Sequence, residues 1–143
     1  MAYQITKEDV WVGEIEDRAG ALAEKLEAVS RVGVNLEFVI ARRAPDQPGT
    51  GVVFMAPFRG KDSVRAALQA GLSQWTSAST LRVEGPDRSG LGALITWTVA
   101  NEGISMRGVS GAKLGERSVF YLAFDDPADA DKAGEALTNA FSR

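Results

Sequence analysis

The 143-residue sequence contains no cysteine and no histidine. Without cysteine, the chain has no disulfides, no thiolate nucleophile and no thiolate metal ligand. Without histidine, it lacks the most common general base and the most common transition-metal ligand. Because these absences exclude many classes of enzyme, we expect a non-catalytic protein that holds no cofactor and no metal ion.

Long apolar runs and strong charge of one sign are also missing. No stretch approaches the ~18 apolar residues that cross a bilayer, and the first eight residues lack the order of a signal peptide. The formal net charge of −3 gives no field that would attract nucleic-acid phosphates or acidic membranes. The hydrophobic content of 45% is that of a globular protein. We therefore expect a cytoplasmic protein that binds neither nucleic acid nor membrane.

A repeat at an offset of 70 residues organises the sequence. The motif Asp17-Arg18-Ala19-Gly20 recurs as Asp87-Arg88-Ser89-Gly90. The match stays in register beyond the motif, through the pairs Ala23 and Ala93, Val29 and Val99, Gly33 and Gly103, and Val39 and Val109. Two copies indicate a pseudo-symmetric pair of domains rather than a solenoid. We expect the first domain to span residues 1–78 and the second residues 79–143.

Both copies show the same alternation of hydrophobic periods. In the first copy the pattern predicts strands at 10–15, 34–40 and 51–56 and helices from 21 to Gly33 and over 61–70. In the second it predicts strands at 80–84, 105–113 and 118–124, with a turn at Gly115-Glu116, and a helix over 91–101. A closing helix begins where Asp126 caps it and Pro127 takes its first position.

The order strand, helix, strand, strand, helix, twice over, predicts an α+β protein. We expect tandem ferredoxin-like βαββαβ units with antiparallel sheets and helices on one face. The only candidate for a fourth strand in the first copy is 74–78, and the second copy shows none. An incomplete sheet leaves an edge that needs a partner, so we expect a homo-oligomer, most simply a dimer.

Both copies resemble the first half of an ACT domain. The resembling segments are Asp17-Arg18-Ala19-Gly20-Ala21-Leu22 with Gly33-Val34-Asn35-Leu36, and 85–91 with Gly103-Ile104-Ser105-Met106. The family often has proline before the motif glycine, where this chain has Ala19 and Ser89. The resemblance implies a small-molecule ligand, most often a free amino acid, and regulation of an enzyme or a transcription factor.

An amino-acid ligand presents a carboxylate and an ammonium on one carbon. Helix N-termini suit the carboxylate, and Gly20 and Gly90 allow the backbone to come close. Asn35 or Ser105 would offer acceptors to the ammonium, and the resemblance implies a site where the glycine loop of one unit faces another unit. The predicted ligand-binding residues are Asp17, Arg18, Ala19, Gly20, Ala21, Asn35, Asp87, Arg88, Ser89, Gly90, Leu91 and Ser105.

Each of these residues also has a purely structural interpretation. Asp17 and Asp87 are equally suited to cap the following helices, and the two motif glycines to tight helix–strand packing. Asn35 and Ser105 are suited to local backbone hydrogen bonds.

Three other functions compete with ligand sensing. Ser110 and Lys113 fit a Ser-x-x-Lys nucleophile motif, but they fall in a predicted strand instead of at a helix start. Segment 117–124 is similar to the aromatic strand of RNA-recognition domains, without its Gly-aromatic-Gly core. The third is a ligand-free interaction module, for which Trp11, Trp75 and Trp97 are candidate interface residues.

Overall fold

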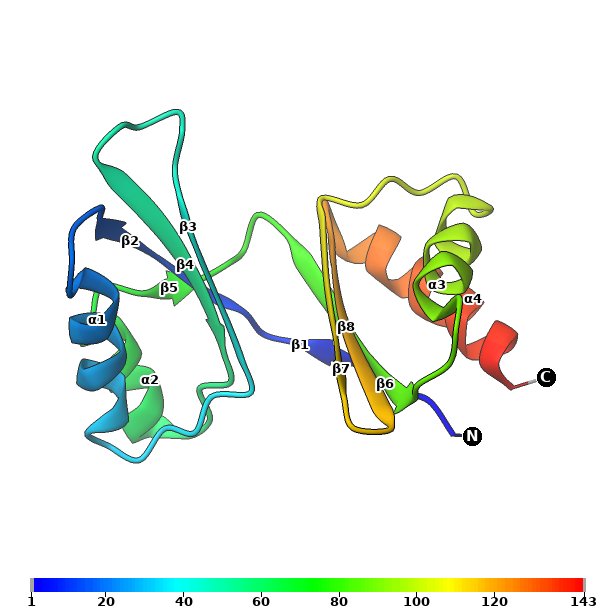
Figure 1. Ribbon diagram of the computed structural model, residues 1–143, viewed down its shortest axis with the longest axis horizontal. Coiled ribbons are helices and arrows are strands. Elements are labelled where there is room, and N and C mark those ends of the chain that lie inside the picture. Colours follow the sequence, from blue (N-terminus) through cyan, green and yellow to red (C-terminus); the bar gives the residue numbers. More distant parts are fainter. Residues whose placement is uncertain (1, 143) are drawn as a thin grey trace. The chain divides into compact units, whose positions relative to one another are not determined.

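The computed structural model describes residues 2–142, which form two compact units (Figure 1). One unit is Asp9–Trp75, and the other combines the described residues before Asp9 with those after Trp75. The predicted domains, 1–78 and 79–143, placed the N-terminal segment in the first unit. The structure places it in the second, because strand β1 (Gln4–Glu8) pairs with β6 (Ser79–Pro86).

The first unit is a four-stranded antiparallel sheet covered by two helices on one face (Figure 1). Its elements are β2 (Trp11–Glu16), α1 (Ala21–Ser30), β3 (Phe38–Arg43), β4 (Thr50–Ala56), α2 (Lys61–Gln69) and β5 (Ser73–Gln74). The strand order is β3-β4-β2-β5. The core between sheet and helices contains Trp11, Val29, Val53, Met55, Phe58, Ala67 and Leu72.

The second unit has the same architecture, with the strand order β1-β6-β8-β7. After β6 come α3 (Leu91–Ala100), β7 (Gly108–Leu114), β8 (Arg117–Phe124) and α4 (Pro127–Phe141). Leu81, Val83, Leu91, Ile95, Val99, Leu122, Phe124 and Leu137 form the centre of its core. Both sheets are antiparallel, so the predicted tandem ferredoxin-like α+β fold is confirmed.

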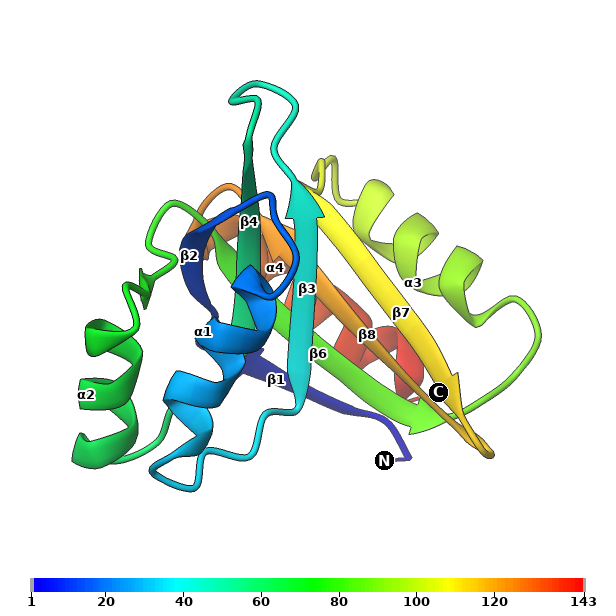
Figure 2. The same cartoon turned by 60° about the vertical axis from the view of Figure 1, so that its left-hand side comes forward.

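The fourth strand of the second unit comes from the other end of the chain. The prediction that this sheet lacks a fourth strand is wrong, because β1 runs antiparallel to β6 (Figure 2) and occupies the place that β5 has in the first unit. The buried ring of Tyr3 stacks on Phe141 at 4.2 Å, and its hydroxyl donates to the carbonyl of Pro86. The open edge on which the dimer was predicted is therefore filled within the chain.

Several element boundaries differ from the predicted ones; for example, the first helix ends at Ser30 instead of at Gly33. The second strand of each repeat begins three to four residues after its predicted start, at Phe38 and Gly108. In the segments before these strands, the backbone bond to the neighbouring strand comes from the last residue, Glu37 or Arg107. Val34 and Leu36 still pack against the core of the first unit. The predicted fourth strand at 74–78 overlaps β5 at Gln74 alone.

An aspartate was considered as the cap of three helices, and the structure has that cap in one of them, α4. Asp126 caps α4, since its Oδ1 accepts the N–H of Asp129 at 2.8 Å. Helices α1 and α3 have no side-chain cap and follow Gly20 and Gly90 at φ of 87° and 80°. Such a left-handed conformation favours glycine. Asp17 and Asp87 therefore do not cap these helices.

Candidate ligand-binding loops

The first glycine loop joins β2 to α1 and is fixed by its own backbone. The N–H of Asp17 donates to the carbonyl of Gly49 at 3.0 Å, and the N–H of Ala21 to that of Arg18 at 3.3 Å. The N–H of Glu24 donates to the Gly20 carbonyl at 2.9 Å, so the helical ladder starts at Gly20. Among residues 2–142, no hydrogen-bond acceptor meets the N–H groups of the two residues between, 22 and 23.

Arg18 forms an ion-pair network at the start of α1. Its guanidinium donates to Glu16 at 2.6 Å and to Glu24 at 2.7 Å. The hydrogen bond to Arg18, followed by the charge of the guanidinium, lowers the pKa of the Glu24 carboxyl. Asp17 pairs with Arg43 of β3 at 2.9 Å. The four side chains at the loop are exposed, so these pairs position the loop more than they stabilise the fold.

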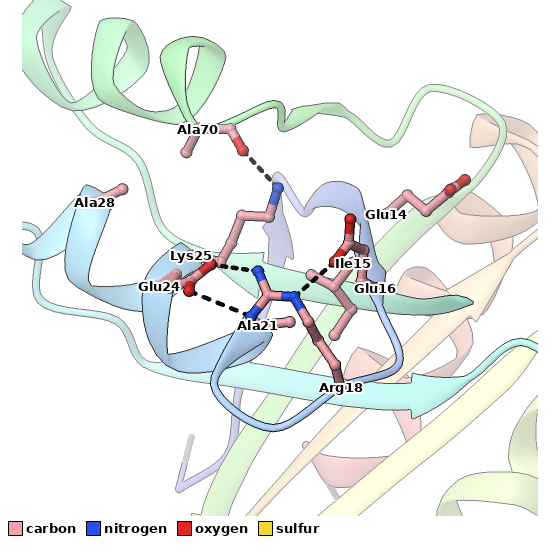
Figure 3. A pocket seen from close by; sticks show the side chains of 9 residues that line it. All are labelled: Glu14, Ile15, Glu16, Arg18, Ala21, Glu24, Lys25, Ala28 and Ala70. Carbon is pink, nitrogen blue, oxygen red and sulfur yellow. Dashed lines mark hydrogen bonds and ion pairs between the residues drawn. The ribbon is translucent and has the colours of Figure 1, made fainter. Parts of the chain in front are cut away.

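A pocket of about 310 Å³ lies between α1, the end of β2 and the end of α2 (Figure 3). This volume is at the lower limit for small-molecule sites. Its lining residues are Glu14, Ile15, Glu16, Arg18, Ala21, Glu24, Lys25, Ala28 and Ala70. Lys25 crosses it and donates from Nζ to the Ala70 carbonyl at 2.6 Å. The pocket therefore has an alanine-rich wall and a rim that carries both signs of charge.

A second pocket, of about 190 Å³, lies on the β3 side of the same loop. It is lined by Ile15, Glu16, Asp17, Arg18, Leu22, Ala41, Arg42, Arg43 and Gly51. The predicted residues Asp17 and Arg18 thus line a pocket together with Arg42 and Arg43, which the sequence did not single out.

The second glycine loop joins β6 to α3 and has different side-chain partners. Asp87 accepts the hydroxyl hydrogen of buried Ser118 at 2.6 Å and pairs with Lys113 at 3.4 Å. The hydrogen bond from Ser118 is the main cause that lowers the pKa of the Asp87 carboxyl. The guanidinium of Arg88 lies 6.0 Å from the ring centre of Phe141. No ion pair crosses the first turn of α3 among the described residues, since that turn has no acidic residue.

The backbone of this loop repeats that of the first. The N–H of Leu91 donates to the Arg88 carbonyl at 3.3 Å, and the N–H of Leu94 to the Gly90 carbonyl at 2.9 Å. Within the described part of the chain, the N–H groups of residues 92 and 93 meet no acceptor. A Cβ on Gly90 would meet nothing within 4 Å. The approach to the start of α3 is thus open.

Comparison with known proteins gives matches of structure alone. No family model and no curated protein matches the chain. Protein BT0572 from Bacteroides thetaiotaomicron is similar with a TM-score of 0.77 at 14% identity, over 95% of this chain and 90% of that one. The ligand-free regulatory subunit of aspartate kinase from Thermus thermophilus has a TM-score of 0.68 at 16% identity, over 99% and 97%. The present chain has a tandem ACT fold.

A longer protein contains the same fold. Escherichia coli aspartokinase III in complex with aspartate and ADP has a TM-score of 0.62 at 10% identity, over 99% of this chain and 33% of that one. At these identities the likeness establishes the tandem ACT fold and leaves the ligand and the activity of this chain to be argued from its own residues.

Each ACT unit places its predicted polar acceptor far from its glycine loop. The N–H of Asp17 is bonded to Gly49, just before β4, whereas the N–H of Glu37, two residues after Asn35, is bonded to the last residue of β4. Seven strand residues separate these points by about 20 Å. Ser105 has the matching position along β8. Both residues are exposed, and neither shares a site with the glycine loop of its own unit.

The pocket beside Lys25 was not predicted from the sequence. In the second ACT unit, Leu91, Ile95 and Val99 form the buried stripe of α3. At the same offset of 70 residues, α1 has Ala21, Lys25 and Val29. A small residue and a lysine on a core-facing stripe were the signal that could have revealed a cavity.

Neither a metal-binding cluster nor a membrane-spanning helix is found among the described residues. Within 2–142, no group of three or more acidic side chains is arranged to hold a metal ion. In the same range, no helix combines the length and the apolar content that crossing a membrane requires.

Proposed function

We propose that this tandem ACT chain is a non-catalytic regulatory protein that binds a free amino acid at its glycine loops and controls an enzyme or a transcription factor. The observation that carries the proposal is that α1 and α3 each start at a left-handed glycine without a side-chain cap. Each start offers two adjacent N–H groups, at 22 and 23 and at 92 and 93, for which the described residues supply no acceptor.

Such a pair of N–H groups suits a ligand carboxylate. Unpaired amides at a helix start carry partial positive charge and point along the helix axis towards an approaching anion. Gly20 and Gly90 leave the approach free of a Cβ, since the nearest atom to a Cβ on Gly20 would be Arg18 Nη1 at 3.9 Å. The ligand would therefore bind with its carboxylate against the first turn.

We assign the acceptor for the ammonium of the ligand to Asn35 or Ser105 of a different unit. Asn35 and Ser105 lie at the far end of their own sheets, so either can meet a glycine loop only where two units face each other. In this proposal the ligand joins a loop of residues 17–21 or 87–91 to the Asn35 or Ser105 region of a neighbouring unit. Ligand binding then shifts the population between unit pairings, which transmits the signal.

The solved relatives support this assignment by analogy of fold. Two of them are a regulatory subunit of aspartate kinase and an aspartokinase in complex with aspartate. We infer from the common fold that the present chain acts on another protein and not on a substrate of its own.

A thermal-shift screen against the twenty amino acids at millimolar concentration tests the proposal. A ligand at a hundredfold its dissociation constant stabilises the folded chain by about 2.7 kcal/mol. We expect one amino acid, or one chemical class, to raise the melting temperature. A chain that responds to no amino acid contradicts the proposal and favours the ligand-free interaction module.

Matched glycine variants locate the site. We expect Gly20→Val or Gly90→Val to abolish the response, because a side chain then blocks the first turn. Gly60→Val is the control, since Gly60 also has positive φ and a Cβ added to it would meet no atom within 4 Å. Loss of the response in this control as well would assign it to backbone strain instead of to the loops.

A further inference from the structure

Helix α3 differs from an ordinary surface helix in its outer face. None of its ten residues is charged. Leu91, Ile95 and Val99 are buried in the core, while Ala93 and Trp97 face away from it. Trp97 is 67% exposed. A helix that is apolar on both faces is normally buried on both, so the outer face of α3 has the character of an interface.

The first repeat shows that the fold does not require this face to be apolar. At the offset of 70 residues, Trp97 corresponds to Glu27 and Leu94 to Glu24. Glu27 pairs with Arg31 at 2.9 Å on the exposed side of α1. The same position is therefore solvated in one unit and apolar in the other, which makes the apolar face a property of α3 itself.

The charges at the two ends of α3 complement those of α3 in a second copy of the chain. Arg88 precedes the helix, Glu102 follows it, and both side chains are exposed. If two α3 helices pack antiparallel about a twofold axis, the Arg88 end of one lies beside the Glu102 end of the other. The helix dipoles then oppose each other favourably, and the uncharged centre meets itself without repulsion between like charges.

The sizes of the central residues are also self-complementary. Ala93 precedes Trp97 by four residues and Ala100 follows it by three, so both share its side of the helix. The small alanines leave room on either side of the indole for the indole of a second chain. An isologous contact requires such a surface, which presents both the protruding residue and the space that receives it.

We propose that the outer face of α3, centred on Trp97, binds the same face of a second copy of this chain to form an antiparallel twofold dimer. This contact is centred on Trp97, and it shares Arg88 and Ala93 with the proposed amino-acid site at the start of α3. Aromatic residues are enriched at the centres of interfaces, where a few of them contribute most of the affinity. The dimer is therefore held mainly by the two indoles.

Sedimentation equilibrium of the full-length protein tests the proposal. We expect the wild type to have the mass of two chains and Trp97→Glu, which copies the residue of the first repeat, to weaken dimerisation by about 30-fold or more. Leu68→Glu is the control, because Leu68 is a 58% exposed hydrophobic residue on α2 of the other unit. A monomeric wild type, or equal dissociation constants for wild type and Trp97→Glu, would overturn the proposal.

A charge exchange tests the orientation independently. Arg88→Glu or Glu102→Arg alone should weaken the dimer, and the double variant should restore it, because opposite charges again meet at each end. A double variant weaker than either single one contradicts antiparallel packing. Tryptophan fluorescence of the wild type gives a readout without mutation, since the exposed indole should shift to shorter wavelength as the concentration rises.

Discussion

Replacing Tyr3 tests the assignment of the N-terminal strand to the second unit. The ring is buried, stacks on Phe141 at 4.2 Å, and donates its hydroxyl hydrogen to Pro86. It also lies over Gly85, where a Cβ would collide with it. Tyr3 therefore joins β1 to the start of the loop before α3 and to the end of α4.

The structure sets the size of the effect. Removing a buried aromatic side chain costs about 3–5 kcal/mol, and Tyr3 lies at the edge of its core, so we expect Tyr3→Ala to destabilise the second unit by about 3 kcal/mol. Tyr3→Phe keeps the stacking and loses one hydrogen bond, worth about 1 kcal/mol. For a unit of this size, 1 kcal/mol lowers the melting temperature by about 4–8 °C.

Amide hydrogen exchange read by mass spectrometry locates the loss. In Tyr3→Ala, peptides from β6, β8 and α4 should exchange faster, while peptides from β2 and β4 of the first unit keep their protection. Tyr3→Phe should show the same pattern at a smaller amplitude. Faster exchange confined to the first unit, or unchanged exchange in both, would refute the pairing of β1 with β6.

Three further perturbations follow from named contacts. Gly85→Ala should destabilise the chain in the presence of Tyr3 and much less in the Tyr3→Ala background, as urea unfolding of the double-mutant cycle would show. Asp126→Ala should lower the free energy of unfolding by about 1 kcal/mol through loss of the α4 cap, with Asp126→Ser restoring most of it. The pKa of Asp87 is lowered in the fold, so its contribution is present above the unfolded pKa of about 3.9 and is lost as the pH falls through the lower folded value. Asp87→Asn should therefore make unfolding less steeply dependent on pH below about 4, and an unchanged acid profile would contradict that role.

The elements that local patterns specify were predictable. The helices follow from apolar spacing and from the glycines that precede and end them, and the strands from alternation, so the repeat alone located both cores. Asp126 and Pro127 marked the start of α4 because a cap and a first-turn proline act within one turn. These signals need no knowledge of distant residues.

Strand β1 was missed because its partner lies about 75 residues away in the sequence. Residues 4–8 contain one aliphatic side chain, Ile5, and resemble a polar terminus when considered alone. Only the pairing with β6 and the packing of Tyr3 against Gly85 make the segment a strand. Without β1, strand β6 was wrongly expected to form an edge of the sheet in the second unit.

The candidate site was predictable in its backbone and not in its side chains. The repeated motif located both glycine loops, yet the partners of Asp17 and Asp87 come from other strands, through Arg43 and Ser118. The pocket beside Lys25 depends on how α1 packs against the end of α2. Such contacts are decided by tertiary packing, which a single sequence does not encode in a local pattern.

Hydrogen exchange in the presence of the twenty amino acids, each added separately at millimolar concentration, tests the proposed ligand site most directly. We predict that at least one amino acid slows exchange at the backbone amides of the first turn of α1 or α3, at residues 22 and 23 or 92 and 93, and that Gly20→Val or Gly90→Val removes this protection. Unchanged exchange at both helix starts with every amino acid, or protection confined to other segments, would contradict amino-acid binding at the glycine loops.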